Sequence, residues 1–270
     1  MRKLQVFSSL NVCVLRQVSS LVFPGEEEMS KKSRIIHGQE LVFNEGRHIY
    51  TWAGEKVPGV TTILGRVNKP FLIQWSADMA AEHFLAAVKS GRTDFDAIHA
   101  DARVAHAKKR DASGESGSNV HGYAECFFKG LPLPELLTDE AKRGVEAFHK
   151  WLDEHHVKVL ASERILFSQK YYYAGTCDFV AEVDGKQVIG DFKTGKRIYD
   201  EARLQTAAYQ QALEEETTTK FSARLIVRFD KATGNFETRE YTDFDLDFTA
   251  FNAALALHKT LQTIEKQKVS

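Results

Sequence analysis

A two-residue turn constrains this chain more than any other sequence feature. Asp184-Gly185 joins two apolar-rich segments, "CDFVAEV" (177–183) and "KQVIGDFK" (186–193). Asp-Gly between alternating segments is the strongest short-range signal for a β-hairpin, because both residues tolerate the positive φ of a type I′ turn. Such a turn fixes the register of the two strands, so the residues that face each other can be read from the sequence.

This register places Asp178 opposite Asp191, with Lys193 two residues further along the same face. Side chains that face each other across two strands have Cβ atoms about 4.5–5.5 Å apart, and like charges at that distance destabilise the pair. A bound cation relieves the repulsion, and hard carboxylate ligands suit Mg²⁺ or Mn²⁺. The hairpin therefore predicts a divalent metal site.

The opposite face of the hairpin collects residues suited to a buried core. An alternative interpretation of the acidic face is a solvated salt bridge between Asp191 and Lys193, with Asp178 as a separate surface acid, and a β-bulge would shift the register. The coincidence of the paired acids with the lysine favours the functional interpretation. The predicted core face comprises Cys177, Phe179, Ala181, Val188 and Phe192.

The rest of the chain alternates between helical and strand patterns, which predicts an α/β or α+β fold. Residues 35–60 resemble short strands separated by Gly and Pro, and "DASGESGSNV" (111–120) resembles a polar break between two helices. The expected helices cover residues 70–91, 95–112, 118–129, 138–156, about 200–214 and from about 245. The expected strands cover 157–168, 171–183 and 186–194, with a second hairpin within 221–242.

Charge and cysteine content exclude several classes of protein. The 270 residues carry a formal net charge of −1, so a nucleic-acid partner must be held by local basic patches or through metal ions. The three cysteines, Cys13, Cys126 and Cys177, are scattered, which argues against a disulfide framework or a paired-cysteine zinc site.

Residues 1–28 have a composition of their own. They contain no acidic residue before Glu26, and Arg2, Lys3 and Arg16 lie among serines and apolar residues, as in an organelle transit peptide. Alternatively, "GEEEM" (25–29) must be encoded by a purine-rich run just ahead of the Met29 codon, which resembles a bacterial ribosome-binding site. We favour the second interpretation, with Met29 as the start, and expect residues 1–34 to be a disordered or mis-assigned extension.

Several short motifs resemble the PD-(D/E)XK nuclease superfamily in its RecB-like exonuclease branch. That branch carries G-x-x-D, then D-x-K-T-G, then Q-x-x-x-Y on the next helix. The corresponding residues here are Gly175 with Asp178, Asp191 to Gly195, and Gln205 with Tyr209.

Further motifs upstream extend the resemblance to roughly residues 57–210. Glu163 in "ASERIL" and Gly117 to His121 in "GSNVHG" match a strand glutamate and a G-x-x-x-H helix motif. "VPGVTTIL" (57–64) and the helix carrying Trp75 resemble phage-encoded and mitochondrial genome maintenance exonucleases. Cys177 stands where the superfamily has proline, as is common in this branch, and "VPG" replaces the usual Pro-Ser.

The resemblance implies a restriction-endonuclease-like core, with a central mixed β-sheet flanked by helices and a helical N-terminal elaboration. We assign residues 35–115 to N-terminal strands and helices that pack on the core, and residues 116–270 to the nuclease core. An iron–sulfur cluster, as found in related CRISPR adaptation nucleases, is not expected, because three unsuitably spaced cysteines cannot hold one.

The resemblance also assigns roles at the metal site. Asp178 and Asp191 become ligands of Mg²⁺ or Mn²⁺, together with the backbone carbonyl of Phe192, and Lys193 acts as a base or as an electrostatic stabiliser. Glu163 is a further catalytic ligand or, alternatively, a surface acid paired with Arg164. His121 is a ligand or, without the family, a capping or packing residue. The catalytic set is Lys193, Asp191, Asp178 and Glu163, and the metal set is Asp178, Asp191, His121, Glu163 and Phe192.

DNA is the partner that the resemblance implies, as single strands or ends, and no membrane is expected. Gln205 and Tyr209 share one helical face, where they hold DNA phosphate or order the site. "QKYYY" (169–173) offers aromatic rings for base stacking, although strand tyrosines alternate faces and at least one must be core. The candidate DNA-binding residues are Gln205, Tyr209, Lys170, Tyr172, Thr194 and Lys196.

The leading functional hypothesis is a metal-dependent DNA exonuclease, with a preference for single strands, in phage or organelle DNA processing. The alternatives are an endonuclease or recombination-repair nuclease with the same core, and a catalytically silent DNA-binding relative, which the intact Asp178, Asp191 and Lys193 argue against. A glycosidase fits poorly, because facing acids on one hairpin are too close. The expected location is the host cytoplasm, or the mitochondrial matrix if residues 1–28 are a transit peptide.

Overall fold

The computed structural model describes residues 33–268, and it begins with a small antiparallel sheet. The interpretations of residues 1–28 therefore lie outside the described residues. The sheet follows chain order and confirms the short strands expected after residue 35. Its strands are β1 (Ser33–Ile36), β2 (Gln39–Asn44), β3 (Ile49–Trp52) and β4 (Glu55–Val57).

The central sheet has five strands in the order β5-β6-β7-β8-β9. Neighbours are antiparallel except β7 and β8, which run parallel and are connected through helix α5 (Glu201–Glu216). The sheet is therefore mixed, as predicted. Its strands are β5 (Val157–Ser168), β6 (Tyr173–Val183), β7 (Lys186–Lys193), β8 (Ala223–Phe229) and β9 (Phe236–Tyr241).

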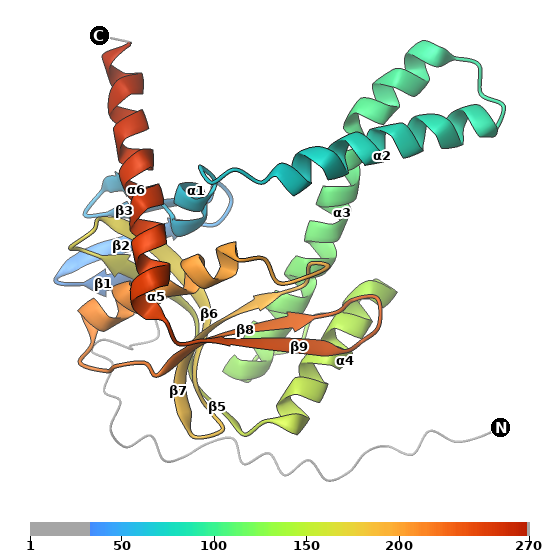
Figure 1. Ribbon diagram of the computed structural model, residues 1–270. Coiled ribbons are helices and arrows are strands. Elements are labelled where there is room, and N and C mark those ends of the chain that lie inside the picture. Colours follow the sequence, from blue (N-terminus) through green and yellow to red (C-terminus); the bar gives the residue numbers. More distant parts are fainter. Residues whose placement is uncertain (1–32, 269–270) are drawn as a thin grey trace, which may run out of the picture.

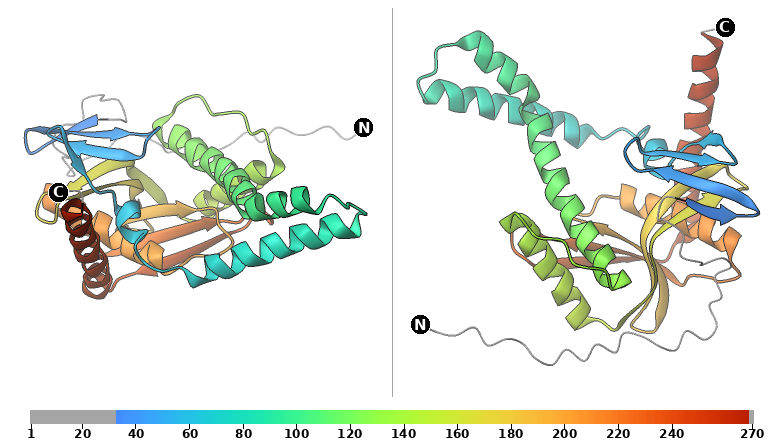
Figure 2. Two further views of the ribbon diagram at one scale, coloured as in Figure 1. Left: turned by 90° about the horizontal axis from the view of Figure 1, so that it is seen from above. Right: turned by 180° about the vertical axis from the view of Figure 1, so that it is seen from behind.

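Helices cover both faces of the central sheet (Figures 1 and 2). One face packs against α1 (Val60–Leu64), α5 and α6 (Phe244–Gln267), and its buried cluster includes Val180 and Ile189. The other face packs against α4 (Asp139–Glu154) and the second half of α3 (Phe95–Lys129). The fold is thus α/β with a restriction-endonuclease-like core, as the sequence predicts.

The central hairpin has the predicted register. Val183 pairs with Lys186 and Phe179 pairs with Gly190, and Asp184 and Gly185 both have positive φ. A Cβ atom on Gly190 would lie 2.0 Å from Cζ of Phe179, so the ring occupies the space that a side chain would fill. The glycine is therefore part of the packing between these two strands.

Helix α3 corrects one prediction, because it is a single helix where we expected two. Gly114 and Gly117 lie in its middle, and each disfavours a helix by roughly 1 kcal/mol. The helix continues because Val120 and Ala124 anchor its second half in the core. With α2 (Pro70–Lys89), the first half forms a helical hairpin that extends away from the sheets (Figures 1 and 2). The boundary that we placed at residues 115 and 116 falls inside α3.

The small sheet is fixed to the central sheet by ring stacking and a buried charge. The rings of Trp52 and Phe167 stack with centroids 4.7 Å apart. Arg34 Nη1 pairs with the Glu216 carboxylate at 2.5 Å and also donates to the Ile165 carbonyl. Glu216 ends α5, so this contact ties three elements together. Among residues 33–268, none of the helices combines the length and apolar character needed to cross a bilayer.

Replacing Gly190 by Ala tests the packing of the central hairpin. The new methyl group would overlap Phe179, and overpacking of this kind typically costs about 1–3 kcal/mol of unfolding free energy. Gly122→Ala is the matched control, because nothing lies within 4 Å of a Cβ there and Ala favours the helix by up to about 1 kcal/mol. Chemical denaturation of both variants should show opposite changes; equal stability of the two would contradict this packing.

Candidate active site

Glu163 lies in the middle of β5, directly opposite Asp178 on β6. The pairs on either side, Ser162 with Phe179 and Arg164 with Cys177, fix this position. Glu163 has φ of 53°, a left-handed conformation that is strained for a residue of this type. Such strain persists where the surrounding structure holds it, and it concentrates at functional sites. The backbone thus turns one acid of β5 towards the acid of β6.

Three side chains meet at this point from two strands and one helix. Ligand atoms of His121, Glu163 and Asp178 all lie within 4.8 Å of one another. His121 Nδ1 is 3.3 Å from Asp178 Oδ2. Two carboxylates and one imidazole form a suitable donor set for a divalent cation such as Mn²⁺, and carboxylates suit Mg²⁺. The structure therefore brings together three of the predicted metal ligands.

A close approach between α3 and the end of β7 positions His121. A Cβ atom on Gly117 would stand 2.7 Å from Oγ1 of Thr194, so a larger residue would push the helix away. His121 follows one helical turn later and therefore lies on the same face of α3 as Gly117. This contact is the physical basis of the G-x-x-x-H motif.

A second network holds Asp191, which is only 3% exposed. The Lys193 ammonium contacts its carboxylate, and Gln205 Nε2 donates to Asp191 Oδ1 at 3.0 Å. Gln205 also donates to Tyr209 Oη at 2.7 Å and accepts from Lys193 Nζ at 3.0 Å. Gln205 therefore connects the acid, the lysine and the tyrosine. Both residues of the Q-x-x-x-Y motif are buried, an arrangement that orders the site, and their contact with DNA phosphate stays a prediction.

Gly175 makes room for this network in the same way that Gly117 does for His121. A Cβ atom there would lie 2.6 Å from Cε1 of Tyr209. Tyr209 can therefore pack against β6, which directs its hydroxyl to Gln205. The glycine of the G-x-x-D motif thus packs directly against the tyrosine of the Q-x-x-x-Y motif.

Asp178 and Asp191 do not form the regular backbone pair that we predicted. The β6–β7 ladder ends at Phe179 and Gly190, and the Phe192 N–H donates to Asp178 Oδ2 at 2.6 Å. Asp178 joins the cluster of His121 and Glu163, whereas Asp191 contacts Lys193 and Gln205. Asp191 and the Phe192 carbonyl as shared metal ligands stay predictions.

Electrostatics separate the two acids further. Burial and the nearby Asp178 charge raise the pKa of Asp191 to about 6. Burial would also raise the pKa of Asp178, but His121 and then Lys193 outweigh it and lower that pKa. Burial would lower the pKa of Lys193, yet Asp191 and Asp178 raise it. Near neutral pH the lysine is therefore a cation between two acids, and Asp178 is the more strongly acidic of the pair.

Tyr50 is a residue of this region that sequence reasoning missed. It lies on β3 of the small sheet, and its hydroxyl shares a hydrogen bond of 2.9 Å with Thr176 Oγ1. Burial raises the pKa of Tyr50 to about 12, with the Glu163 charge contributing. The small sheet therefore reaches the edge of the site. No sequence signal marked this residue, because a tyrosine in an alternating strand usually serves packing.

The structure separates the other predicted DNA-binding residues. Thr194 lies against Gly117 beside the site, and Lys196 is exposed in the loop after β7. Lys170 lies at the β5–β6 turn, and the ring of Tyr172 packs against Trp52 and Phe167, which limits its use for base stacking. Tyr173 is fully buried, which confirms that one tyrosine of this run is core. DNA binding by these residues stays a prediction.

The predicted core face of the hairpin is wrong at one position. Phe179, Ala181, Val188 and Phe192 share the buried cluster under α4, but Cys177 packs in the opposite cluster with Val180 and Ile189. The alternation of β6 therefore changes at Asp178. This irregularity coincides with the place where the β6–β7 ladder ends.

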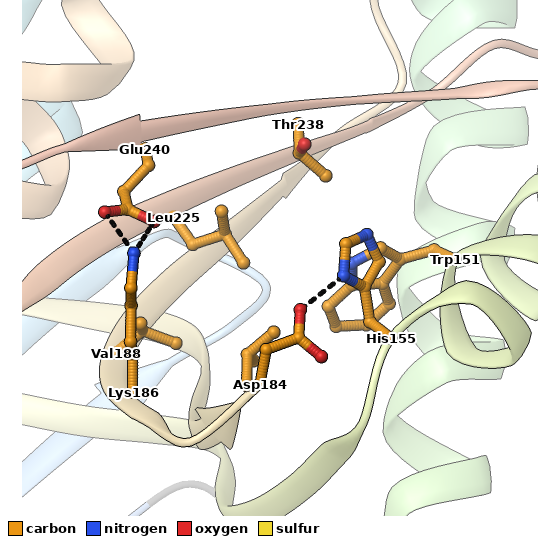
Figure 3. Close-up of a pocket in the computed structure, with 9 residues that line it drawn as sticks. Trp151, His155, Asp184, Lys186, Val188, Leu225, Thr238 and Glu240 are labelled. Atoms are coloured by element: carbon orange, nitrogen blue, oxygen red, sulfur yellow. Dashed lines mark hydrogen bonds and ion pairs between the residues drawn. The ribbon is translucent and has the colours of Figure 1, made fainter.

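A separate surface pocket lies beside the turn of the hairpin (Figure 3). It has a volume of about 130 Å³ and is bordered by the ion pair of Lys186 with Glu240 and by the hydrogen bond between Asp184 and His155. Six residue steps along each strand separate this turn from the aspartates, which corresponds to roughly 20 Å. Because both of its acids already have hydrogen-bond partners and it is far from the aspartates, this pocket is not the candidate active site.

Comparison with known proteins identifies the family of this chain. The family model of the PD-(D/E)XK nuclease superfamily matches residues 132–268, about half of the chain, which confirms the resemblance found in the sequence. A comparison with curated proteins gave no match.

Solved structures of an alkaline exonuclease, LHK-Exo from Laribacter hongkongensis, are also similar to this chain. One is a complex with dAMP, at 13% identity and a TM-score of 0.31, and the other has 10% identity and a TM-score of 0.32. Each covers 57% of this chain and 86% of the exonuclease chain.

Replacing Gly117 by Ala tests how His121 is positioned. The methyl group would press on Thr194, displace this turn of α3 and weaken binding of Mn²⁺, as measured by calorimetry. Gly114→Ala is the matched control on the same helix, because nothing lies within 4 Å of a Cβ there. The double variant Gly117→Ala/Thr194→Ala removes the contacting hydroxyl and should recover affinity. Equal affinity in all variants would show that this contact does not position the histidine.

The pKa of Asp191 predicts how stability of the metal-free protein depends on pH. An unfolded Asp has a pKa near 3.9, so the raised folded pKa, about 6, means that stability falls as pH rises from about 4 through 6. Burial would lower the pKa of His121, but Asp178 raises it. Deprotonation of His121 therefore reduces the stability of the folded protein further at higher pH. In EDTA, Asp191→Asn should reduce this loss, whereas Asp184→Asn, which keeps a favourable turn sequence, should retain it. Thermal unfolding at several pH values measures both, and an unchanged slope in Asp191→Asn would refute the prediction.

Proposed function

Because the chain belongs to the PD-(D/E)XK nuclease superfamily, we propose that it is a divalent-metal-dependent DNA exonuclease. It would hydrolyse phosphodiester bonds, with a preference for single strands, in phage or organelle DNA processing. The observation that carries this proposal is the cluster of His121, Glu163 and Asp178 beside the Lys193 ammonium. A cation site next to a fixed positive charge is the arrangement that phosphoryl chemistry requires.

The residues present fit Mg²⁺ or Mn²⁺. Glu163 and Asp178 provide carboxylate oxygens and His121 an imidazole nitrogen, all within reach of one ion. When bound, such an ion polarises the phosphate and lowers the pKa of a coordinated water. The hydrogen bond from the Phe192 N–H fixes the orientation of Asp178, so this ligand is held in place before a metal arrives. Preorganisation of this kind is what a catalytic metal site needs.

Lys193 acts best as an electrostatic group in this arrangement. In the metal-free protein burial would lower the pKa of Lys193, but Asp191 and Asp178 raise it, which favours the ammonium form over a proton acceptor. Gln205 and Asp191 hold its ammonium in position, where it offsets the charge that grows on the phosphate. We therefore propose charge stabilisation, and not general-base catalysis, as its role. Asp191 supports the lysine and, once ionised, adds negative charge near the metal.

Digestion of linear and covalently closed circular DNA tests the proposal. With Mg²⁺ or Mn²⁺, the protein should shorten end-labelled linear DNA and leave circles intact, and EDTA should abolish the activity. Nicking of circles would indicate an endonuclease, and no cleavage with either metal would contradict both forms of nuclease.

Two lysines of β7 provide a matched pair of variants for this assay. Lys193→Met should lower kcat by roughly 10²–10³-fold, because it removes a charge aimed at the reacting phosphate. Lys186→Met removes an exposed lysine that pairs with Glu240 at the far end of the same strand, and it should retain full activity. Equal loss in both variants would indicate a general effect on the fold.

A further inference from the structure

We propose that Phe71, Tyr199 and Arg197 form a stacking platform that binds an unpaired base of the DNA strand entering the active site. This inference rests on the proposed nuclease function and names a binding site for its substrate. The ligand class is single-stranded DNA, recognised through the face of a nucleobase and the adjacent phosphate.

The three side chains are already arranged as an aromatic stack with a cation beside it. The rings of Phe71 and Tyr199 lie 4.6 Å apart at an interplanar angle of 10°. The Arg197 guanidinium carbon is 4.7 Å from the centroid of Tyr199 and 5.6 Å from that of Phe71. These three distances form a compact triangle, so the guanidinium lies beside the stack and leaves the outer ring faces uncovered by it.

The platform does not belong to the protein core. Phe71 and Tyr199 are only partly buried, Arg197 is exposed, and neither ring packs against the buried clusters of the two sheets. The rings come from the start of α2 and from the loop between β7 and α5, which are distant in sequence. Aromatic groups that are stacked yet partly exposed are available to a ligand.

The platform lies close to the catalytic groups. Lys69, two residues before Phe71, pairs with Glu201 at 2.7 Å. Glu201 is four residues before Gln205 on α5, so the two lie about one turn apart on one face, about 6 Å along the axis. Gln205 itself contacts Asp191 and Lys193. A strand whose phosphate reaches Lys193 can therefore continue along this side of α5 towards the platform.

The chemistry of the platform suits unpaired bases of any sequence. Stacking of a base on an aromatic ring contributes about 1–3 kcal/mol, and every base offers a π-face. Arg197, with exposed Lys196 beside it, adds positive charge for the phosphate. A base within a duplex already has both faces stacked, so the platform selects single strands or frayed ends. The competing interpretation is that the stack only attaches α2 to the central domain.

Photocrosslinking locates the bound base directly and needs no cleavage. A short oligonucleotide carrying 5-iododeoxyuridine near its end is irradiated with the full-length protein in EDTA, and crosslinked peptides are identified by mass spectrometry. The proposal predicts crosslinks at Tyr199 or Phe71. Crosslinks that map only elsewhere would overturn it.

Leucine substitutions separate stacking from attachment. Phe71→Leu and Tyr199→Leu retain apolar contact but lose the aromatic face, so KM for single-stranded DNA should rise by about 5–150-fold with kcat within twofold. Phe244→Leu, in a comparable stack with Phe248 on α6, is the matched control and should leave KM unchanged. A lower Tm with unchanged KM in the platform variants would show that the stack is only an attachment.

The outcome for the platform can be distinguished from the outcome for the nuclease. If the wild-type protein cleaves no DNA with any metal, the proposed function fails, while crosslinking and binding affinity still test the platform. If the wild-type protein cleaves DNA and the leucine variants retain its KM, the platform alone is contradicted.

Discussion

The hydrogen bond from the Phe192 N–H to the Asp178 carboxylate is the interaction on which the candidate site depends. It lies just beyond the last backbone pair of β6 and β7, Phe179 with Gly190. The Asp178 side chain therefore accepts a hydrogen bond from the backbone of β7 at the position where the next pair of residues would form. Asp178 can then reach His121 and Glu163, while Asp191 remains buried with Lys193. The end of the regular β6–β7 pairing therefore separates two neighbouring groups of residues. One is the candidate cation site of His121, Glu163 and Asp178, and the other is the Asp191–Lys193 pair.

Close packing against glycine gives the site its geometry. Gly117 lets α3 approach Thr194 and thereby positions His121, whereas Gly175 lets Tyr209 pack on β6 and direct its hydroxyl to Gln205. Different sequence motifs are thus linked by contacts that a Cβ atom on either glycine would disrupt. The short motifs are far apart along the chain, but in the structure residues of one motif pack against residues of another. Chemistry and packing are inseparable at this end of the sheet.

The sequence predicted the central hairpin and most of the strands, because Asp184-Gly185 and the alternating apolar residues are local signals. It could not predict that α3 is continuous, since helix propensity favours a break at Gly114 and only tertiary anchoring of the second half overrides it. Cys177 was placed on the wrong face because strand periodicity cannot predict the change of alternation at Asp178. Tyr50 was missed because its role arises from contact between two sheets.

The most direct measurement of the central claim is an anomalous difference map from crystals of the protein soaked in Mn²⁺. The account predicts a peak roughly 2.0–2.3 Å from ligand atoms of His121, Glu163 and Asp178, with the Lys193 ammonium nearby. A peak bound only by other residues, or none at an Mn²⁺ concentration that supports DNA cleavage, would contradict it.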